Sequence, residues 1–150
     1  MRRRFNRTCV ALCAVAAIAG QATAAPMADT VVGVWLVRQD GAPFPMHVYV
    51  FNADGTLQQA NPDAGNARRS DSDGKGIWFR RSGHIVGKWV ELSADRDSHR
   101  YIGRGELTFD LRLDRNRLAG TSTFRGFDAS GASTGEPIAV PFDGTRVTYP

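Results

Sequence analysis

Histidines are the first side chains to consider for chemistry, because histidine commonly serves in acid–base catalysis and in metal binding. The 150-residue sequence has three, His47, His84 and His99, and none has the short spacing of a zinc site on one element. The sequence therefore indicates no metal site. His47 alternates with Tyr49 and Phe51, so these side chains share one face of a strand. His47 either points into the protein or is a partly exposed strand histidine, and we expect the second. His84 and His99 lie in or beside polar turns, and we expect both in water.

Glu91 is the second candidate for acid–base chemistry. It lies two residues after Trp89, and therefore on the same face of an extended strand. If that face is buried, the pKa of the carboxyl rises and Glu91 becomes a candidate general acid or base beside His47 or Tyr49. The opposite face of this segment carries Val86, Val90 and Leu92. That face is at least as apolar, so we expect it to be buried and Glu91 to lie in water.

Aromatic residues are more numerous than a core of this size requires. Aromatic walls are typical of pockets for apolar ligands, although simple packing is the alternative. The candidates for a ligand-binding lining are Tyr49, Trp89, Tyr101, Phe109 and Phe124. No Gly-x-Ser-x-Gly motif is present, so a serine hydrolase is not indicated.

The elements that must position these residues are short β-strands joined by turns. No 11-residue window has the 3.6-residue apolar period of an amphipathic helix. The predicted strands span 31–38, 46–52, 56–60, 76–81, 84–93, 100–113, 118–127 and 138–148. Predicted turns with Gly, Asp or Asn lie at 52–55, 81–83, 114–117 and 128–131. The polar, glycine-rich stretch 61–75 is expected to be a mobile loop near one mouth of the fold.

The segment 100–113 gives the clearest assignment of faces. Tyr101, Leu107, Phe109, Leu111 and Leu113 alternate with polar residues, which predicts one buried and one solvated face. Gly103 and Gly105 fall on the apolar face, where missing side chains suit a strongly coiled strand. Eight sequential strands predict an all-β fold, a closed up-and-down antiparallel barrel with no exposed edges. The interior of such a barrel holds either one small ligand or packed side chains.

The first and last predicted strands carry Gly33-Val34-Trp35 and Gly144-Thr145-Arg146. These motifs resemble the Gly-x-Trp and the late arginine at the closing seam of lipocalin-like, calycin-type barrels. The resemblance implies that Arg146 lies across the ring of Trp35, where such stacking contributes about 0.5–2 kcal/mol. It also implies that Gly33, Trp35 and Arg146 have structural roles. No Thr-Asp-Tyr-like second motif is present, and the allene-oxide-cyclase and dirigent type of eight-stranded barrel looks similar at this level.

The N-terminal segment has the pattern of an export signal. Four arginines among the first seven residues precede an apolar, alanine-rich stretch, and small residues suited to cleavage follow at 22–24. We expect a signal peptide over 1–24 and a single barrel domain over 25–150, located in the periplasm or secreted. The arginines also fit the twin-arginine pattern of proteins exported in the folded state, and this alternative stays open.

Removing that segment changes the charge and thiol content of the protein. Both cysteines, Cys9 and Cys13, lie within it, so the domain has no thiol for a disulfide or a nucleophile. The four arginines carry the whole excess of 19 basic over 15 acidic residues. A formally neutral domain does not indicate binding to nucleic acid. No apolar run outside the signal approaches the roughly 20 residues of a membrane span. No cofactor is indicated, and the sequence carries no information on oligomeric state.

Together these observations predict an exported lipocalin-like barrel that binds a small, largely apolar molecule between its strands. One alternative is a metal-independent cyclase, isomerase or lyase acting on a hydrophobic small molecule inside the barrel. The other is a packed barrel that acts as an envelope interaction module. A binder needs an aromatic lining and a polar anchor, an enzyme needs titratable groups directed at one point, and an interaction module needs a filled interior. No residue is assigned a catalytic role, and His47, Glu91 and Tyr49 remain candidates.

Overall fold

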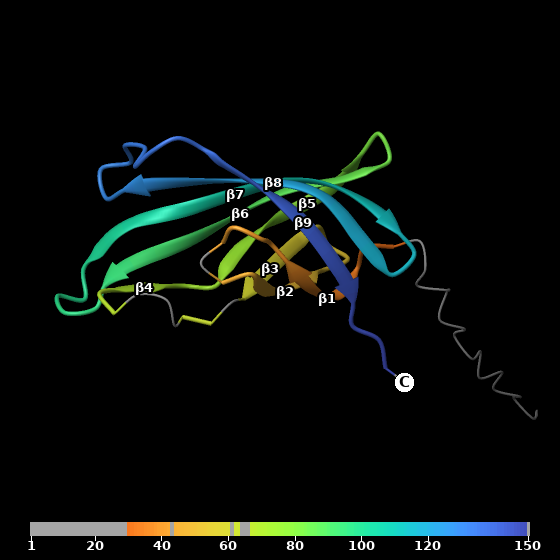
Figure 1. The fold of residues 1–150 in the computed structure, drawn as a ribbon, viewed down its shortest axis with the longest axis horizontal. Helices are drawn as coiled ribbons and strands as arrows, with labels where there is room; N and C mark the ends of the chain where they lie inside the picture. Colours follow the sequence, from red (N-terminus) through yellow and green to blue (C-terminus); the bar gives the residue numbers. More distant parts are fainter. Residues whose placement is uncertain (1–29, 43, 61, 64–66, 150) are drawn as a thin grey trace, which may run out of the picture.

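The computed structural model describes residues 30–42, 44–60, 62–63 and 67–149, and these residues form β-strands without any helix (Figure 1). The strands are β1 (Gly33–Arg38), β2 (Met46–Phe51), β3 (Thr56–Ala60), β4 (Arg69–Asp71), β5 (Gly74–Arg81), β6 (His84–Asp95), β7 (Tyr101–Asp114), β8 (Arg117–Asp128) and β9 (Ile138–Arg146). The predicted strands are all present, with ends that differ by two residues or fewer. The predicted signal lies outside the described residues. Within the described part, nothing helical is long and apolar enough to cross a membrane.

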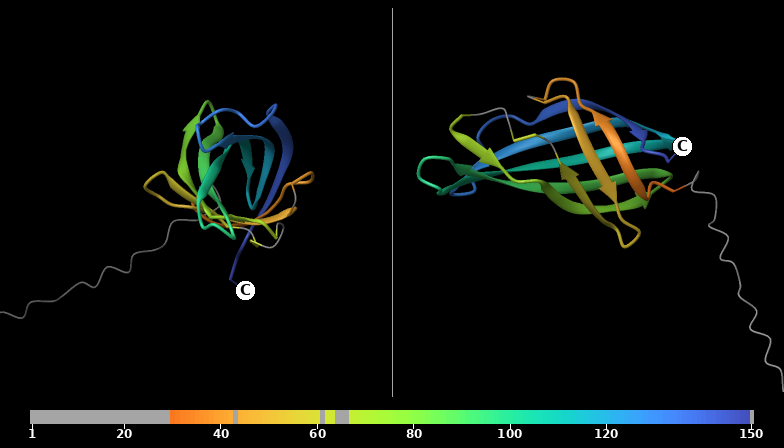
Figure 2. Two further views of the ribbon diagram at one scale, coloured as in Figure 1. Left: turned by 90° about the vertical axis from the view of Figure 1, so that its left-hand side faces the viewer. Right: turned by 90° about the horizontal axis from the view of Figure 1, so that it is seen from below.

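Eight of these strands form a closed antiparallel ring. Their order is β6, β5, β3, β2, β1, β9, β8 and β7, and pairing between β7 and β6 closes the ring. Seen nearly end-on in the left view of Figure 2, the strands encircle one axis. The short β4 pairs with the last residues of β6, beyond the part of β6 that pairs with β5. The predicted all-β closed barrel is confirmed, and this architecture is compatible with a lipocalin-like fold.

The first and last strands seal the barrel as the two short motifs predict. Trp35 pairs with Arg146, and the guanidinium carbon lies 4.3 Å from the centre of the indole ring. Arg146 donates hydrogen bonds to the backbone oxygens of Val32, at 2.8 Å, and Thr30. The indole Nε1 of Trp35 donates to the backbone oxygen of Val31, at 2.8 Å. We call this arrangement the seam. It ties the chain before β1 to the end of β9.

Glycines provide the backbone conformations that the turns and the seam require. Gly55 and Gly83 have φ angles of 85° and 82° in two of the predicted turns. Gly33 has a φ of 137° at the first residue of β1. A side chain at these angles is strained, and glycine is not. The role of Gly33 at the seam is therefore to adopt this backbone conformation.

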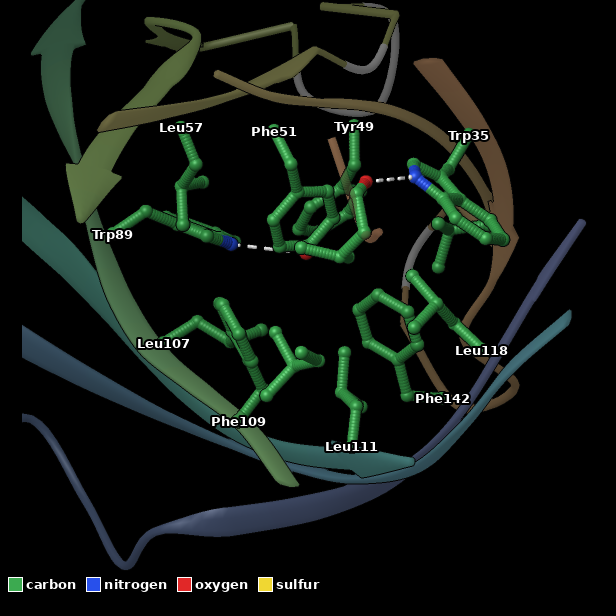
Figure 3. Close-up of a cluster of buried hydrophobic side chains, with 13 residues drawn as sticks. Trp35, Tyr49, Phe51, Leu57, Trp89, Leu107, Phe109, Leu111, Leu118 and Phe142 are labelled. Carbon is green, nitrogen blue, oxygen red and sulfur yellow. Dashed lines mark hydrogen bonds between the residues drawn. The ribbon is translucent and has the colours of Figure 1, made fainter. Parts of the chain in front are cut away.

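Side chains fill the interior next to the seam. The buried cluster contains Val31, Trp35, Val37, Tyr49, Phe51, Leu57, Ile85, Trp89, Leu107, Phe109, Leu111, Leu118 and Phe142 (Figure 3). The ring of Phe51 meets the rings of Trp78 and Phe109 edge-on, with centroids 5.9 Å apart in each pair. Such aromatic pairs contribute about 0.5–1.5 kcal/mol beyond the area that they bury. Much of the aromatic surplus noted in the sequence is therefore packing.

The stretch 61–75, predicted to be a loop, contains a strand. β4 occupies residues 69–71, and β5 begins at Gly74. Between them, the backbone N–H of Ser72 donates to the oxygen of Leu92 at 2.9 Å, and the Ser72 hydroxyl accepts the N–H of Leu92 at 3.0 Å. The prediction was wrong here because β4 is polar and has no apolar alternation. Its hydrogen bonds to β6 create the strand, and a hydrophobic pattern does not reveal them.

Tyr101 was predicted on the buried face of its strand, and the structure places it outside. Ser93 of β6 pairs with Gly103, whereas the next residue, Ala94, pairs with Tyr101, so Ile102 is an extra residue in β7. Such a bulge reverses the alternation of side chains beyond it. Tyr101 is consequently 47% exposed, and Ile102 faces the interior in its place. The other apolar residues of this strand have the predicted orientation.

Candidate functional site

A cavity of about 510 Å³ occupies the end of the barrel opposite the seam. Its rim comes from the loop between β1 and β2, from the chain around β4, and from the connection between β8 and β9. This is the left-hand end in Figure 1, where β4 and the loop joining β6 to β7 lie. Apolar walls come from Trp89, Ile102, Leu107, Phe124 and Val140.

His47 points into this cavity, contrary to the expectation that it is partly exposed. It is only 8% exposed, whereas its neighbours Met46 and Val48 are each 41% exposed. Because side chains alternate along β2, burial of Tyr49 and Phe51 in the core forces His47 to the same side. Nδ1 of His47 lies 2.9 Å from the side-chain nitrogen of Gln59 on β3. The histidine is therefore fixed in the wall of the cavity.

The other ring nitrogen of His47, Nε2, lacks a regular hydrogen bond within the described part of the chain. Among the described residues, Nε2 is buried and has no hydrogen-bond partner of normal length and angle. Burial lowers the pKa of His47, and the backbone carbonyl of Phe44 opposes that effect only in part. The ring is therefore neutral at pH 7. A buried polar group left unpaired costs about 1–3 kcal/mol, so this atom needs a reason to be there.

Glu91 also faces the cavity, which corrects the expectation that it lies in water. On β6 the inward positions are those of Trp89 and Ser93, 3% and 6% exposed, while Leu92 is 54% exposed. The pKa of Glu91 is raised to about 7, mainly by burial and also by the negative charge of Asp71, while Arg69 opposes the increase. The carboxyl is thus divided between its neutral and ionised forms near neutral pH, as a general acid or base requires.

The space for the Glu91 carboxyl comes from a glycine on the neighbouring strand. Gly105 pairs with Glu91, and a Cβ atom at position 105 would lie 2.7 Å from Oε1 and 2.6 Å from the ring of Phe124. Glycine at this position lets a carboxyl and an aromatic ring share one wall. The sequence analysis placed Gly105 on the inner face, but it did not place the carboxyl of Glu91 there.

β4 adds charged groups that the sequence analysis missed. Asp71 and Arg69 line the cavity beside Glu91, and the hydroxyl of Ser93 donates to Asp71 at 2.6 Å. Asp71 acts on Glu91 more strongly than Arg69 does, so the surroundings of this carboxyl are net negative. The only signal in the sequence was the run of polar residues at 69–73, which carries no information on where they fold.

Tyr49 lies below the cavity and does not line it. Nε1 of Trp89 donates to the Tyr49 hydroxyl at 2.9 Å (Figure 3). This hydroxyl donates to Oε1 of Gln39 at 3.3 Å. Gln39 donates to the hydroxyl of Ser122 at 2.7 Å, which donates to the backbone oxygen of Val140 at 3.2 Å. Burial raises the pKa of Tyr49 beyond its usual range. Its hydroxyl is held in this chain of bonds and stays protonated.

The predicted ligand-binding residues therefore separate into three groups. Trp89 and Phe124 line the cavity, Tyr49 and Phe109 lie in the packed core, and Tyr101 is on the outer surface. Gln39 and Gln59, each 1% exposed, line the cavity and were missed. For Gln59 a signal existed, because it alternates with Leu57 on the inner face of β3. For Gln39 there was none, because it follows the end of β1.

The two other histidines stay away from the cavity. His84 is partly exposed on the barrel surface, where its Nδ1 contacts the carboxylate of Asp110 and its Nε2 accepts from Arg112 at 3.2 Å. His99 is exposed in the loop after β6. Nowhere in the described ranges do three His, Cys, Asp or Glu side chains gather as metal ligands would.

The chemistry available in the cavity is hydrogen bonding by a neutral imidazole and proton exchange by a carboxyl, beside aromatic and aliphatic walls. Comparison of the chain with family models, with curated proteins and with solved structures gives no match. The geometry of the cavity therefore carries the functional argument.

Proposed function

We propose that this protein binds a small, largely apolar molecule in the cavity opposite the seam. The observation that carries the proposal is the contrast within one barrel between an interior packed with side chains and a cavity of about 510 Å³. Pockets of about 300–1,000 Å³ with apolar walls and few polar groups are typical of small-molecule sites. A barrel of this kind could bind small ligands, whereas an interaction module needs no such space.

The direct test uses the neutral fluorescent probe N-phenyl-1-naphthylamine. The wild-type protein is expected to bind it, and Leu107→Trp, which fills the cavity from β7, is expected to weaken binding at least about tenfold, or 1.4 kcal/mol. Thr108→Trp is the matched control, because the neighbouring side chain on β7 is exposed on the outer surface. Equal binding by the two variants contradicts the proposal.

A second candidate function is metal-independent catalysis on a hydrophobic small molecule. The observation that favours it is that His47 and Glu91, from different walls, face one cavity, and Glu91 titrates near pH 7. Tyr49 cannot join them, because its hydroxyl is engaged below the cavity. Catalysis requires turnover of a cyclisable or isomerisable compound that Glu91→Gln abolishes without weakening its binding. Binding without turnover across such a set leaves the binding protein as the function.

We also propose that the chain is exported and that its signal is removed by cleavage near Ala25. The supporting observation is the arginine-rich, apolar pattern of the first two dozen residues. Intact-mass measurement of the protein recovered from the periplasm or the medium should give a chain that begins at or near Ala25. Replacing Arg2 and Arg3 together by Lys should block export only if the twin-arginine route is used. A full-length chain retained in the cytoplasm contradicts the proposal.

A further inference from the structure

We infer that the ligand is an uncharged, mostly apolar molecule whose polar end carries an oxygen acceptor, such as a ketone, held by the Nε2–H of His47. The inference rests on the proposed function and adds to it the chemical class of the ligand and the residue that selects it.

The partners of Gln59 decide which nitrogen of His47 carries the proton. The backbone N–H of Gly74 can only donate, and it lies 3.1 Å from Oε1 of Gln59. The amide oxygen of Gln59 is therefore the end that accepts, and its NH2 group is the end at Nδ1 of His47, 2.9 Å away. Nδ1 must accept this bond, so in the neutral ring the proton is on Nε2. The fixed tautomer makes Nε2 a donor.

This donor is buried in the cavity wall, and no described residue accepts from it at normal length and angle, although the backbone carbonyl of Phe44 is near enough to the ring to raise its pKa. Every other side-chain donor named on this side of the barrel has a partner, including Gln39, Ser93 and Trp89. A neutral N–H in such a place is complementary to a carbonyl or similar oxygen. The same cavity lining contains Trp89 and Leu107, which suit the apolar remainder of the molecule.

The charges in the lining argue against an anionic ligand. Four carboxyl side chains line the cavity, those of Asp63, Asp71, Glu91 and Asp128, against the two cationic side chains Arg69 and Arg104. Arg104 is engaged with Glu106 at 2.7 Å and lies over the ring of Phe127. Asp63 is paired with Arg96 at 2.8 Å, which leaves Asp71, Asp128 and the partly ionised Glu91 against Arg69. A carboxylate ligand would therefore meet a net negative lining, and an uncharged oxygen would not.

Four naphthalenes of similar size separate the possibilities. They carry an acetyl group (2-acetylnaphthalene), an ethyl group (2-ethylnaphthalene), a carboxylate (2-naphthoate) or an ammonium (2-naphthylmethylamine), and each is tested at pH 7 by displacement of N-phenyl-1-naphthylamine. The ketone should bind about fivefold more tightly than the ethyl compound, as expected for one hydrogen bond, and the carboxylate more weakly than either. In His47→Phe the preference for the ketone should disappear. His84→Phe, which changes a histidine on the outer surface, should retain it.

A measurement on the wild-type protein makes the test independent of how the variant folds. Long-range 1H–15N spectra of the imidazoles should show His47 as the Nε2–H tautomer, with its nitrogen shift changing when 2-acetylnaphthalene is added. The Nδ1–H tautomer, or an unchanged signal in the saturated complex, overturns the inference.

The outcomes separate this inference from the function on which it rests. If 2-ethylnaphthalene fails to bind, the cavity is not an apolar-ligand site and both proposals fail. If it binds and the ketone gains nothing, or His47→Phe keeps the gain, only the assignment of His47 fails. Tighter binding of the amine or the carboxylate than of the ketone overturns the uncharged class.

Discussion

The two ends of the barrel each contain a buried nitrogen that lacks a partner among the described residues, Nε of Arg146 at the seam and Nε2 of His47 in the cavity. At the seam, the other nitrogens of Arg146 bond to backbone oxygens and the guanidinium covers Trp35. The gain from these contacts offsets one unpaired N–H, and Arg146 is not part of the cavity lining. At His47 the unpaired N–H belongs to a side chain of the cavity lining. In our proposal, the same defect is structural at one end and serves ligand binding at the other.

The seam should account for the largest effect on stability. Arg146→Met removes the contact with Trp35 and two hydrogen bonds to backbone oxygens, so the free energy of unfolding should fall by about 3 kcal/mol. Urea denaturation measures the loss. Arg117→Met is the control, because Arg117 forms an exposed ion pair with Asp143 at 3.0 Å and should lose less than about 1 kcal/mol. Equal losses would show that the seam is not a special point of the barrel.

Two glycines on the inner face compare the packed core with the cavity. A Cβ at Gly87 would lie 2.4 Å from the ring of Phe109 and 2.5 Å from a backbone oxygen, whereas at Gly105 both close neighbours are side-chain ends beside the cavity. Gly87→Ala should therefore cost about 2–3 kcal/mol of unfolding free energy, and Gly105→Ala about 1 kcal/mol or less. Thermal or urea unfolding measures both. A larger loss at Gly105 would mean that the cavity wall is as rigid as the core.

Glu91 should make stability fall as the pH rises. Its pKa is about 7 in the folded protein against a reference value of 4.5, so its contribution is complete below about pH 4.5 and is lost as the pH rises through 7. Glu91→Gln cannot ionise. It should exceed the wild type in unfolding free energy by about 1–2 kcal/mol at pH 8 and match it near pH 4.5.

Glu106 supplies a control of opposite sign for that experiment. Hydrogen bonds from Lys88 and Arg104 lower the pKa of Glu106, so its ionised form stabilises the fold and this contribution disappears on acidification. Glu106→Gln should therefore be less stable than the wild type at pH 8. If both variants change stability in the same direction at pH 8, the contrast between a buried and a paired carboxyl is incorrect.

The smallest expected effect concerns the aromatic residues. Phe124→Ala removes part of the cavity wall and should weaken binding of N-phenyl-1-naphthylamine about fivefold, or roughly 1 kcal/mol. Tyr101→Ala removes an aromatic ring of the outer surface and should leave the affinity unchanged. Fluorescence titration compares the two. An effect of Tyr101→Ala as large as that of Phe124→Ala would place the ligand outside the cavity.

The packed end was the more predictable of the two. Alternating apolar residues located its strands, glycines located its turns, and the motifs around Trp35 and Arg146 identified the pair that closes it. The strands and turns depend on residues that are close in sequence, and the closure depends on one specific contact, between Trp35 and Arg146. At the cavity end, the sequence identified His47 and Glu91 as candidates but expected both to face outward. It also missed β4 and the bulge at Ile102.

The sequence by itself determined the class of fold, because a two-residue apolar period punctuated by turns is compatible with strands alone. It also determined which side chains share a face, as for His47 with Tyr49 and for Glu91 with Trp89. Only the tertiary structure decided which face is inside and which half of the barrel stays unfilled. Those outcomes depend on strands that are distant in the chain. Gln59 on β3 bonds to His47, and Gly105 on β7 leaves room beside Glu91. β4 places the charged residues Asp71 and Arg69 near Glu91. An alternating pattern does not specify which of the two faces is buried. Contacts between strands distant in the chain determine that face.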